Sequence, residues 1–132
     1  MHVVFGANIE LQGGHYGNAV LSRFPVAGHR NHLLPNLDNG EQRGVLIAEI
    51  ELPGQPQPLR FMATHSDHRR ADAERIASAE AINALAIEHP ETATLLAGDL
   101  NDTPDSEILR TFGQQWASVN QQPLPTIPVG EP

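Results

Sequence analysis

The segment Gly98 to Asn101 carries a carboxylate and a carboxamide at a spacing that could perform chemistry. Its sequence is Gly-Asp-Leu-Asn, and it follows an apolar stretch that is typical of a buried strand. Asp99 and Asn101 are two residues apart, so in an extended chain their side chains point the same way. Such a pair can hold a water molecule or a cation while it donates to a phosphoryl oxygen. A plain turn is the alternative, because glycine, aspartate and asparagine are common turn residues.

A second candidate segment, Thr64 to Arg70, concentrates ionisable side chains at the end of another predicted strand. It holds two histidines, one aspartate and two arginines within six residues. A histidine can donate to a phosphate or act as a general acid or base, and His65 lies nearest the end of the strand. We therefore expect His65 to be functional. The residues His68, Arg69 and Arg70 are typical of an exposed loop between a strand and a helix.

A third segment, residues 16–25, has the pattern of a strand followed by a turn. Ser22 and Arg23 could supply a hydroxyl and a phosphate clamp, although such residues are more often structural, and Arg43 carries the same ambiguity. The chain contains no H-E-x-x-H, P-loop, G-x-S-x-G or G-x-G-x-x-G motif. Chemistry through a serine nucleophile is therefore poorly supported.

The hydrophobic pattern predicts a layered α/β or α+β arrangement that positions these segments. The clearest strand is 43–52, which has one fully apolar face and one face that becomes polar at its end. Apolar residues at three- and four-residue steps predict one long helix, with Asp72 as its N-cap and Pro90 as its stop. The full prediction comprises strands at 2–7, 16–23, 43–52, 59–64 and 92–97, helices at 72–89 and 104–112, and a loop or short edge strand at 29–40.

Local residue types add detail to these elements. The strands at 16–23 and 92–97 are expected to be mostly buried. Thr103 followed by Pro104 resembles an N-cap and the first residue of the second helix. Residues 119–132 contain four prolines and little periodicity, so they are predicted to form a loop.

The composition limits the classes of protein to which the chain can belong. Its 132 residues fit one small domain, and 39% hydrophobic residues support a modest core. The absence of cysteine excludes disulfide frameworks, zinc–thiolate sites and thiol nucleophiles. No run approaches the ~18 apolar residues of a membrane span. The net charge of −8 argues mildly against avid nucleic-acid binding, although carboxylates that hold a cation also make a site acidic.

Three segments, in this order, resemble the endonuclease/exonuclease/phosphatase superfamily with its DNase I-like fold. They are YGNAVLSRFPV at 16–26, the strand RGVLIAEIEL at 43–52 with FMATHSDHR at 61–69, and LLAGDLNDTP at 95–104. Each piece alone is weak, but the combination is quite specific, and the match runs from about Val3 to Phe112. The resemblance implies a two-sheet α/β sandwich, of which this chain holds the central part, and a metal-dependent phosphoesterase activity.

The resemblance also implies roles for the candidate residues. Asp99 positions or deprotonates the attacking water, and Asn101 supports the same oxygens and contacts the metal. The expected ion is Mg²⁺ or Mn²⁺, held by Asp99 and Asn101. His65 donates to the phosphate as charge builds in the transition state. The candidate substrate contacts are Asn18, Arg43 and His68.

The chain also departs from the family pattern. It lacks the family's Gln-Glu pair, whose Glu is the principal metal ligand, and the terminal Asp-His pair, and Ser66 replaces the more usual Leu. We therefore expect residues 1–132 to be a partial domain, without the family's N- and C-terminal parts. A metal without its main carboxylate binds weakly, so the chain alone is expected to be feeble or inactive.

Two alternatives to an enzyme are open at this point. One is a non-catalytic binding module on the same fold, and the other is a structural domain in which residues 98–101 form only a turn. The expected partner is a phosphoester, whether nucleic acid, phospholipid or a small phosphate ester. The acidic charge and 5% aromatic residues favour a small or lipid-like ester slightly. No obligatory protein partner is inferred, and the sequence indicates no cellular compartment.

Overall fold

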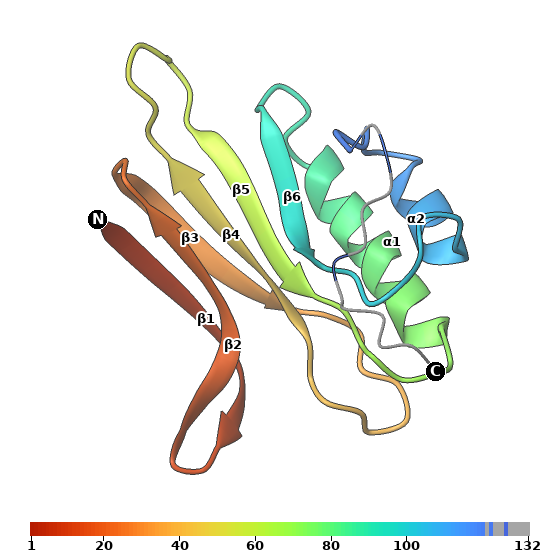
Figure 1. Ribbon diagram of the computed structural model, residues 1–132. Coiled ribbons are helices and arrows are strands. Elements are labelled where there is room, and N and C mark those ends of the chain that lie inside the picture. Colours follow the sequence, from red (N-terminus) through yellow and green to blue (C-terminus); the bar gives the residue numbers. More distant parts are fainter. Residues whose placement is uncertain (121, 123–125, 127–132) are drawn as a thin grey trace.

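The computed structural model describes residues 1–120, 122 and 126, which form two sheets and two helices (Figure 1). A two-stranded sheet pairs β1 (His2–Leu11) with β2 (Gly14–Ser22). A four-stranded sheet in the order β3-β4-β5-β6 contains β3 (Val26–Leu33), β4 (Gly44–Ile50), β5 (Leu59–His65) and β6 (Thr94–Asp99). The helices are α1 (Ala73–Ile87) and α2 (Glu107–Phe112). This mixed architecture confirms the predicted α/β fold class.

Strand β4 contributes to both hydrophobic cores, because alternate residues of a strand face opposite sides of the sheet. On one side, Val45 and Ile47 pack in a cluster with residues of α1 and α2. On the other side, Leu46 and Ala48 pack with Val20 of β2. The described part of the molecule therefore has three layers, in which the β1–β2 hairpin and the helices cover opposite faces of the four-stranded sheet (Figure 1).

Strands β5 and β6 are parallel neighbours, and α1 connects them. Parallel strands have their carboxyl ends at the same edge of the sheet, and open α/β sheets place their sites at such an edge. His65 is the last residue of β5 and Asp99 is the last residue of β6. The β5-α1-β6 unit therefore brings the two predicted candidate segments to one edge.

The strand predictions are confirmed for the sheet centre and corrected in extent at an edge. Of the two alternatives for 29–40, a loop or a short edge strand with a turn, the structure has the edge strand, β3, which begins earlier than predicted and spans residues 26–33. β3 pairs with β4 on one side only, and most of its polar side chains are exposed or half-buried. An edge strand needs no apolar alternation to satisfy its backbone, so the residue pattern left the choice between a strand and a loop open and did not give its bounds.

The burial predicted for two strands is also corrected. In β2, Val20 and Ser22 are buried but Leu21 is 63% exposed, because the hairpin packs on the sheet with one face only. In β6, Leu95 is 47% exposed, because within the described residues this edge strand lies beyond the part of the sheet that the hairpin covers. Apolar composition alone therefore overestimated the burial of these strands.

The predicted long helix is confirmed, but the predicted helix starts need correction. Asp72 occupies the N-cap position of α1, yet its side chain makes no capping hydrogen bond. The second helix begins at Glu107, after Ser106, whose hydroxyl accepts from the Leu109 N–H at 3.4 Å. Pro104 therefore lies in the preceding turn rather than in the first turn of the helix.

The loop predicted at 119–132 falls mostly outside the described residues. Those of its residues that are described, 119, 120, 122 and 126, belong to no helix or strand. Neither helix in the described part of the chain is long and apolar enough to cross a membrane.

Candidate functional site

His65 and Asp99 lie side by side at the carboxyl edge of the sheet. They are register partners in the parallel β5–β6 pair, and the Ser66 N–H donates to the Asp99 carbonyl oxygen at 2.9 Å. Gly98 permits this pairing, because a Cβ atom there would lie 2.8 Å from the Thr64 carbonyl carbon and would overlap its oxygen. His65 is half-buried and Asp99 is exposed, so both side chains reach solvent.

Asn101 is tied to both strands that end at this edge. Its φ of +51° lies in the left-handed region, which asparagine tolerates better than most residues. Its backbone N–H donates to Asp99 Oδ1 at 2.9 Å, and its Nδ2 donates to the Ser66 carbonyl oxygen at 2.9 Å. Asp99 therefore ends β6 in an Asx turn to Asn101, and this turn fixes the orientation of both candidate side chains.

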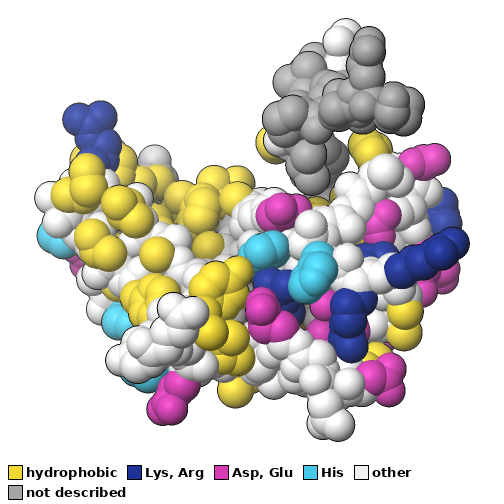
Figure 2. Space-filling view, turned by 60° about the horizontal axis from the view of Figure 1, so that its bottom comes forward, with side chains coloured by type: hydrophobic (Ala, Val, Ile, Leu, Met, Phe, Trp, Pro, Cys, Tyr) yellow, Lys and Arg dark blue, Asp and Glu magenta, His cyan; other side chains and the backbone are white. Residues whose placement is uncertain are grey.

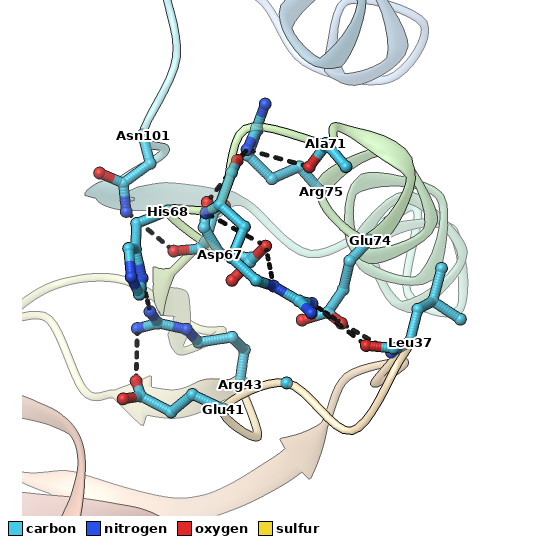
Figure 3. Close-up of polar contacts among 12 residues, drawn as sticks. Leu37, Glu41, Arg43, Asp67, His68, Ala71, Glu74, Arg75 and Asn101 are labelled. Carbon is cyan, nitrogen blue, oxygen red and sulfur yellow. Dashed lines mark hydrogen bonds and ion pairs between the residues drawn. The ribbon is translucent and has the colours of Figure 1, made fainter.

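Asp99 and Asn101 offer oxygen atoms of the kind that hard divalent cations prefer. Because Asn101 Nδ2 binds the Ser66 carbonyl, the amide oxygen points away from that strand end (Figure 3). A carboxylate and a carboxamide oxygen suit Mg²⁺ or Mn²⁺, which take about six oxygen ligands. Within the described residues, no group of three or more His, Asp or Glu side chains is arranged to hold a metal ion. Asp99 and Asn101 therefore provide the kind of oxygen ligand that Mg²⁺ or Mn²⁺ prefers, but they supply only part of the coordination shell of such an ion.

The hairpin contributes two polar side chains to this edge from β2. The Tyr16 hydroxyl lies 3.4 Å from His65 Nδ1, a contact that the sequence did not suggest. Asn18 Nδ2 donates to the Gly44 carbonyl oxygen at 2.9 Å, and Thr64 Oγ1 donates to the same oxygen at 3.0 Å. The amide nitrogen of Asn18 therefore joins the hairpin to β4, and the role of Asn18 as a substrate contact stays a prediction.

The shared Gly44 carbonyl predicts a coupled effect of two substitutions. We expect Thr64→Val and Asn18→Leu each to lower the free energy of unfolding by about 1 kcal/mol, the usual net value of one hydrogen bond. The double variant is expected to lose about 1 kcal/mol more than the sum, because the carbonyl then loses both side-chain donors. Urea unfolding of the four proteins measures this coupling, and strict additivity would contradict it.

Arg43 immediately precedes β4 and contacts His68 near this edge (Figure 3). Its NH2 group is 3.1 Å from His68 Nδ1, and its NH1 group is 3.0 Å from Glu41 Oε1. The Arg43 side chain is 3% exposed, whereas His68 is exposed. The structure thus brings two of the predicted substrate contacts together, and their role toward a substrate stays a prediction.

A buried charged cluster, which the sequence analysis missed, supports the loop after His65. Asp67 and Glu74 have side chains only 1% and 2% exposed, and Arg69 pairs with both, at 2.9 and 2.6 Å. Glu74 also accepts from the Leu37 N–H at 2.6 Å, which ties the β3–β4 loop to α1. The hydrogen bond with Asp67 raises the pKa of Arg69 above its ordinary value. Arg69 is therefore a structural cation and not the freely solvated side chain predicted.

The helix spacing contained a signal for this burial. Glu74, Ser78 and Ile82 are four residues apart, so they share the face of α1 that packs on the sheet. Ile82 belongs to the predicted apolar stripe, and counting back from it by fours would have placed Glu74 inside. The compensating Arg69 lies outside the helix, where periodicity gives no information.

The buried side chain of Arg75 forms a second contact between the two candidate segments. Its side chain is 8% exposed, and its Nε donates to Asp102 Oδ2 at 3.1 Å. Its NH1 donates to the carbonyl oxygens of Asp67 at 3.5 Å, of Ala71 at 3.4 Å, and of Arg69. One guanidinium thus holds the loop that follows His65 and the turn that follows Asp99.

The surface around this edge combines two kinds of side chain. Figure 2 shows histidine, arginine and acidic side chains gathered on one part of the surface, next to an apolar area on the side of the hairpin. The exposed large apolar residues of the hairpin are Val3, Phe5, Leu11, Tyr16 and Leu21. The edge therefore has a polar, ionisable part beside an apolar one.

Solved structures share this fold at low sequence identity. A mannosyl-6-phosphatase of Bacteroides thetaiotaomicron matches with a TM-score of 0.69 and 16% identity, over 85% of this chain and 48% of that one. The human nocturnin catalytic domain with bound sulfate matches with a TM-score of 0.67 and 17% identity, over 85% of this chain and 46% of that one. A protein of Enterococcus faecalis V583 matches with a TM-score of 0.70 and 19% identity, over 86% and 49%. These likenesses confirm the DNase I-like fold.

Sequence comparisons identify the family. The chain is 37% identical to the uncharacterized protein YbhP of Escherichia coli K12 over 100 residues. The aligned segment covers 74% of this chain and 38% of that protein. The chain therefore spans about two fifths of the length of the curated relatives it matches. The model of the Endonuclease/Exonuclease/phosphatase family, which includes phosphoester hydrolases, matches residues 3–123. Since that match covers most of the sequence, the chain belongs to the endonuclease/exonuclease/phosphatase family.

Proposed function

We propose that this chain contributes His65, Asp99 and Asn101 to the catalytic site of a metal-dependent phosphoester hydrolase. The observation that carries the proposal is the register of β5 and β6, which pairs His65 with Asp99 at one edge of the sheet. Asn101 is fixed to both strand ends by its two hydrogen bonds at 2.9 Å. A base, a donor and oxygen ligands at one edge are what hydrolysis of a phosphoester by water requires.

Each of the three side chains has a role that its surroundings support. The Asp99 carboxylate accepts a hydrogen bond from the Asn101 N–H through one oxygen and can orient or deprotonate a water through the other. The imidazole of His65 can donate to a phosphoryl oxygen as charge develops. A bound Mg²⁺ or Mn²⁺, held by the oxygens of Asp99 and Asn101, would supply charge neutralisation at the phosphoryl group.

Metal binding by the isolated 132-residue chain is expected to be weak. Two oxygen-bearing side chains provide fewer ligands than the roughly six that Mg²⁺ requires, so water would fill most of the shell. Because activation of water depends on that ion, slow hydrolysis is expected from this chain by itself. The partial-domain assignment of residues 1–132 stays a prediction.

Hydrolysis of chromogenic phosphodiesters and phosphomonoesters tests the proposal. We expect slow turnover that depends on added Mg²⁺ or Mn²⁺ and that falls at least about 100-fold in Asp99→Asn, because the carboxylate that orients the water is lost. The matched control is Asp105→Asn, an exposed aspartate in the turn before α2, which should keep the wild-type rate. Turnover that survives in Asp99→Asn would contradict the proposed role.

A non-catalytic phosphoester-binding module is the second candidate. The small number of oxygen ligands at the edge favours it, because binding of a phosphate through histidine donors requires no complete metal site. Phosphate binding without measurable turnover at saturating Mg²⁺ would support this module over the hydrolase. For either function, the net charge of −8 favours a small or lipid-like ester over nucleic acid.

A further inference from the structure

The contact between Arg43 and His68 determines which nitrogen of the imidazole carries the proton. A guanidinium has only donor groups and stays charged at all accessible pH values. With Arg43 NH2 at 3.1 Å, His68 Nδ1 must be the acceptor, and the proton of the neutral ring must be on Nε2. Free imidazole exchanges between two neutral tautomers, so this contact selects one of them.

Arg43 itself is poorly placed to meet a substrate. Its side chain is 3% exposed, and its NH1 faces Glu41 Oε1 at 3.0 Å. His68, in contrast, is exposed on the loop that follows His65, and its ring faces Arg43 (Figure 3). The hydrogen bond from Asn101 Nδ2 to the Ser66 carbonyl holds this loop against the end of β6. Any effect of Arg43 on a ligand at the edge must therefore pass through His68.

We propose that His68 presents its Nε2–H to a phosphoryl oxygen of the substrate, and that Arg43 is the positioning residue that fixes this tautomer. Glu41 compensates the charge of Arg43, so the buried guanidinium already has an anionic partner and does not need the substrate as one. The loop that follows His65 then offers an oriented Nε2–H donor. This inference rests on the proposed function, because it adds a phosphate contact to the same site.

Nuclear magnetic resonance of the ¹⁵N-histidine-labelled 132-residue chain at pH 8 tests the tautomer without any turnover. We expect His68 to show a protonated Nε2 and an unprotonated Nδ1. In Arg43→Met, the tautomers should mix, whereas in Arg70→Met, which replaces an exposed arginine two residues from His68, the pattern should stay. An Nδ1–H tautomer in the wild-type protein overturns the proposal, even if Arg43→Met does not fold.

Titration with inorganic phosphate tests the donor role. Isothermal titration calorimetry measures the affinity of every variant, and the shift of the His68 Nε2 resonance is followed in the wild type and in Arg43→Met, which keep His68. We expect His68→Phe and Arg43→Met each to weaken binding about tenfold, the effect of one hydrogen bond to a charged group. The double variant should bind no more weakly than His68→Phe, because Arg43 acts through the same contact. A further loss in the double variant would make Arg43 a direct phosphate ligand and would overturn its positioning role.

The outcomes separate this inference from the proposed hydrolysis. A chain that binds phosphate through His68 Nε2 but shows no Asp99-dependent turnover supports the inference and contradicts the slow hydrolysis proposed for this chain. Turnover that depends on Asp99, with no phosphate-induced shift at His68 Nε2, supports the hydrolase and overturns the inference.

Discussion

Gly98→Ala is expected to lower the free energy of unfolding by about 3 kcal/mol, at the upper end of the cost of forcing atoms into a filled space. The new Cβ would lie 2.8 Å from the carbonyl carbon of Thr64 and 3.2 Å from the backbone nitrogen of Thr64. The same Cβ would overlap the Thr64 carbonyl oxygen. These are backbone atoms of the paired strand, so they cannot move aside without opening the β5–β6 ladder. Urea unfolding followed by circular dichroism measures the loss.

The matched control for this substitution is Gly28→Ala in β3 of the same sheet. A Cβ there would meet only Glu49 Oε2, at 3.5 Å, which is an ordinary contact with a flexible side chain. We expect its stability to stay within about 0.5 kcal/mol of wild type. Equal unfolding midpoints for the two variants would show that the close approach of the Thr64 backbone to Gly98 does not determine the stability of the sheet.

The consequence of Gly98→Ala extends to the site. Opening of the β5–β6 ladder would separate His65 from Asp99, whose alignment depends on that register. Any residual folded Gly98→Ala protein is therefore expected to lose hydrolysis as well, because a displacement of about 1 Å can cost roughly 100-fold in rate.

Arg75→Met is the second substitution with a large expected effect, a loss of about 3 kcal/mol in the free energy of unfolding. Methionine fills a similar volume but donates nothing. The substitution leaves Asp102 without its partner at 3.1 Å and removes the donor to three backbone carbonyl oxygens. The cost is greatest at the Asp67 carbonyl oxygen, which lies in a buried contact, because a buried acceptor that loses its donor carries the full cost of desolvation.

Arg110→Met in α2 is the control for Arg75→Met. Arg110 is exposed and donates to the Asp105 carbonyl oxygen, so its loss should change stability by no more than about 0.5 kcal/mol. Hydrogen exchange adds a local measurement, since residues 67–71 should exchange faster in Arg75→Met even where the sheet remains protected. Equal stability of the two arginine variants would contradict the bridging role of Arg75.

Elements with a strong local pattern were predicted well from the sequence. The strand at 43–52 and the helix at 72–89 correspond to β4 and α1, because continuous or periodic apolar residues require burial. The two candidate segments were located for a related reason. A buried strand that ends in polar residues indicates the edge of a sheet, and both segments follow such strands.

The predictions that failed concern features whose partners are distant in the sequence. Strand β3 has no apolar alternation, and it exists because β4 supplies hydrogen bonds to its backbone. Burial of Asp67 and Glu74 is possible only because Arg69 lies between them in space. Local residue types favour exposure at these positions. The spacing of α1 could have placed Glu74 inside, but neither periodicity nor composition reveals the burial of Asp67 or the partner that Arg69 supplies.

By itself, the sequence determined the α/β class, the central elements and the membership of His65, Asp99 and Asn101 in two strand-end segments. Only the tertiary structure decided that His65 and Asp99 are register partners and that the guanidinium of Arg43 faces His68. The physical reason is the range of the interactions. Hydrophobic periodicity and turn chemistry act within a few residues, whereas strand register and buried ion pairs depend on groups that are brought together only when the sheet and α1 pack.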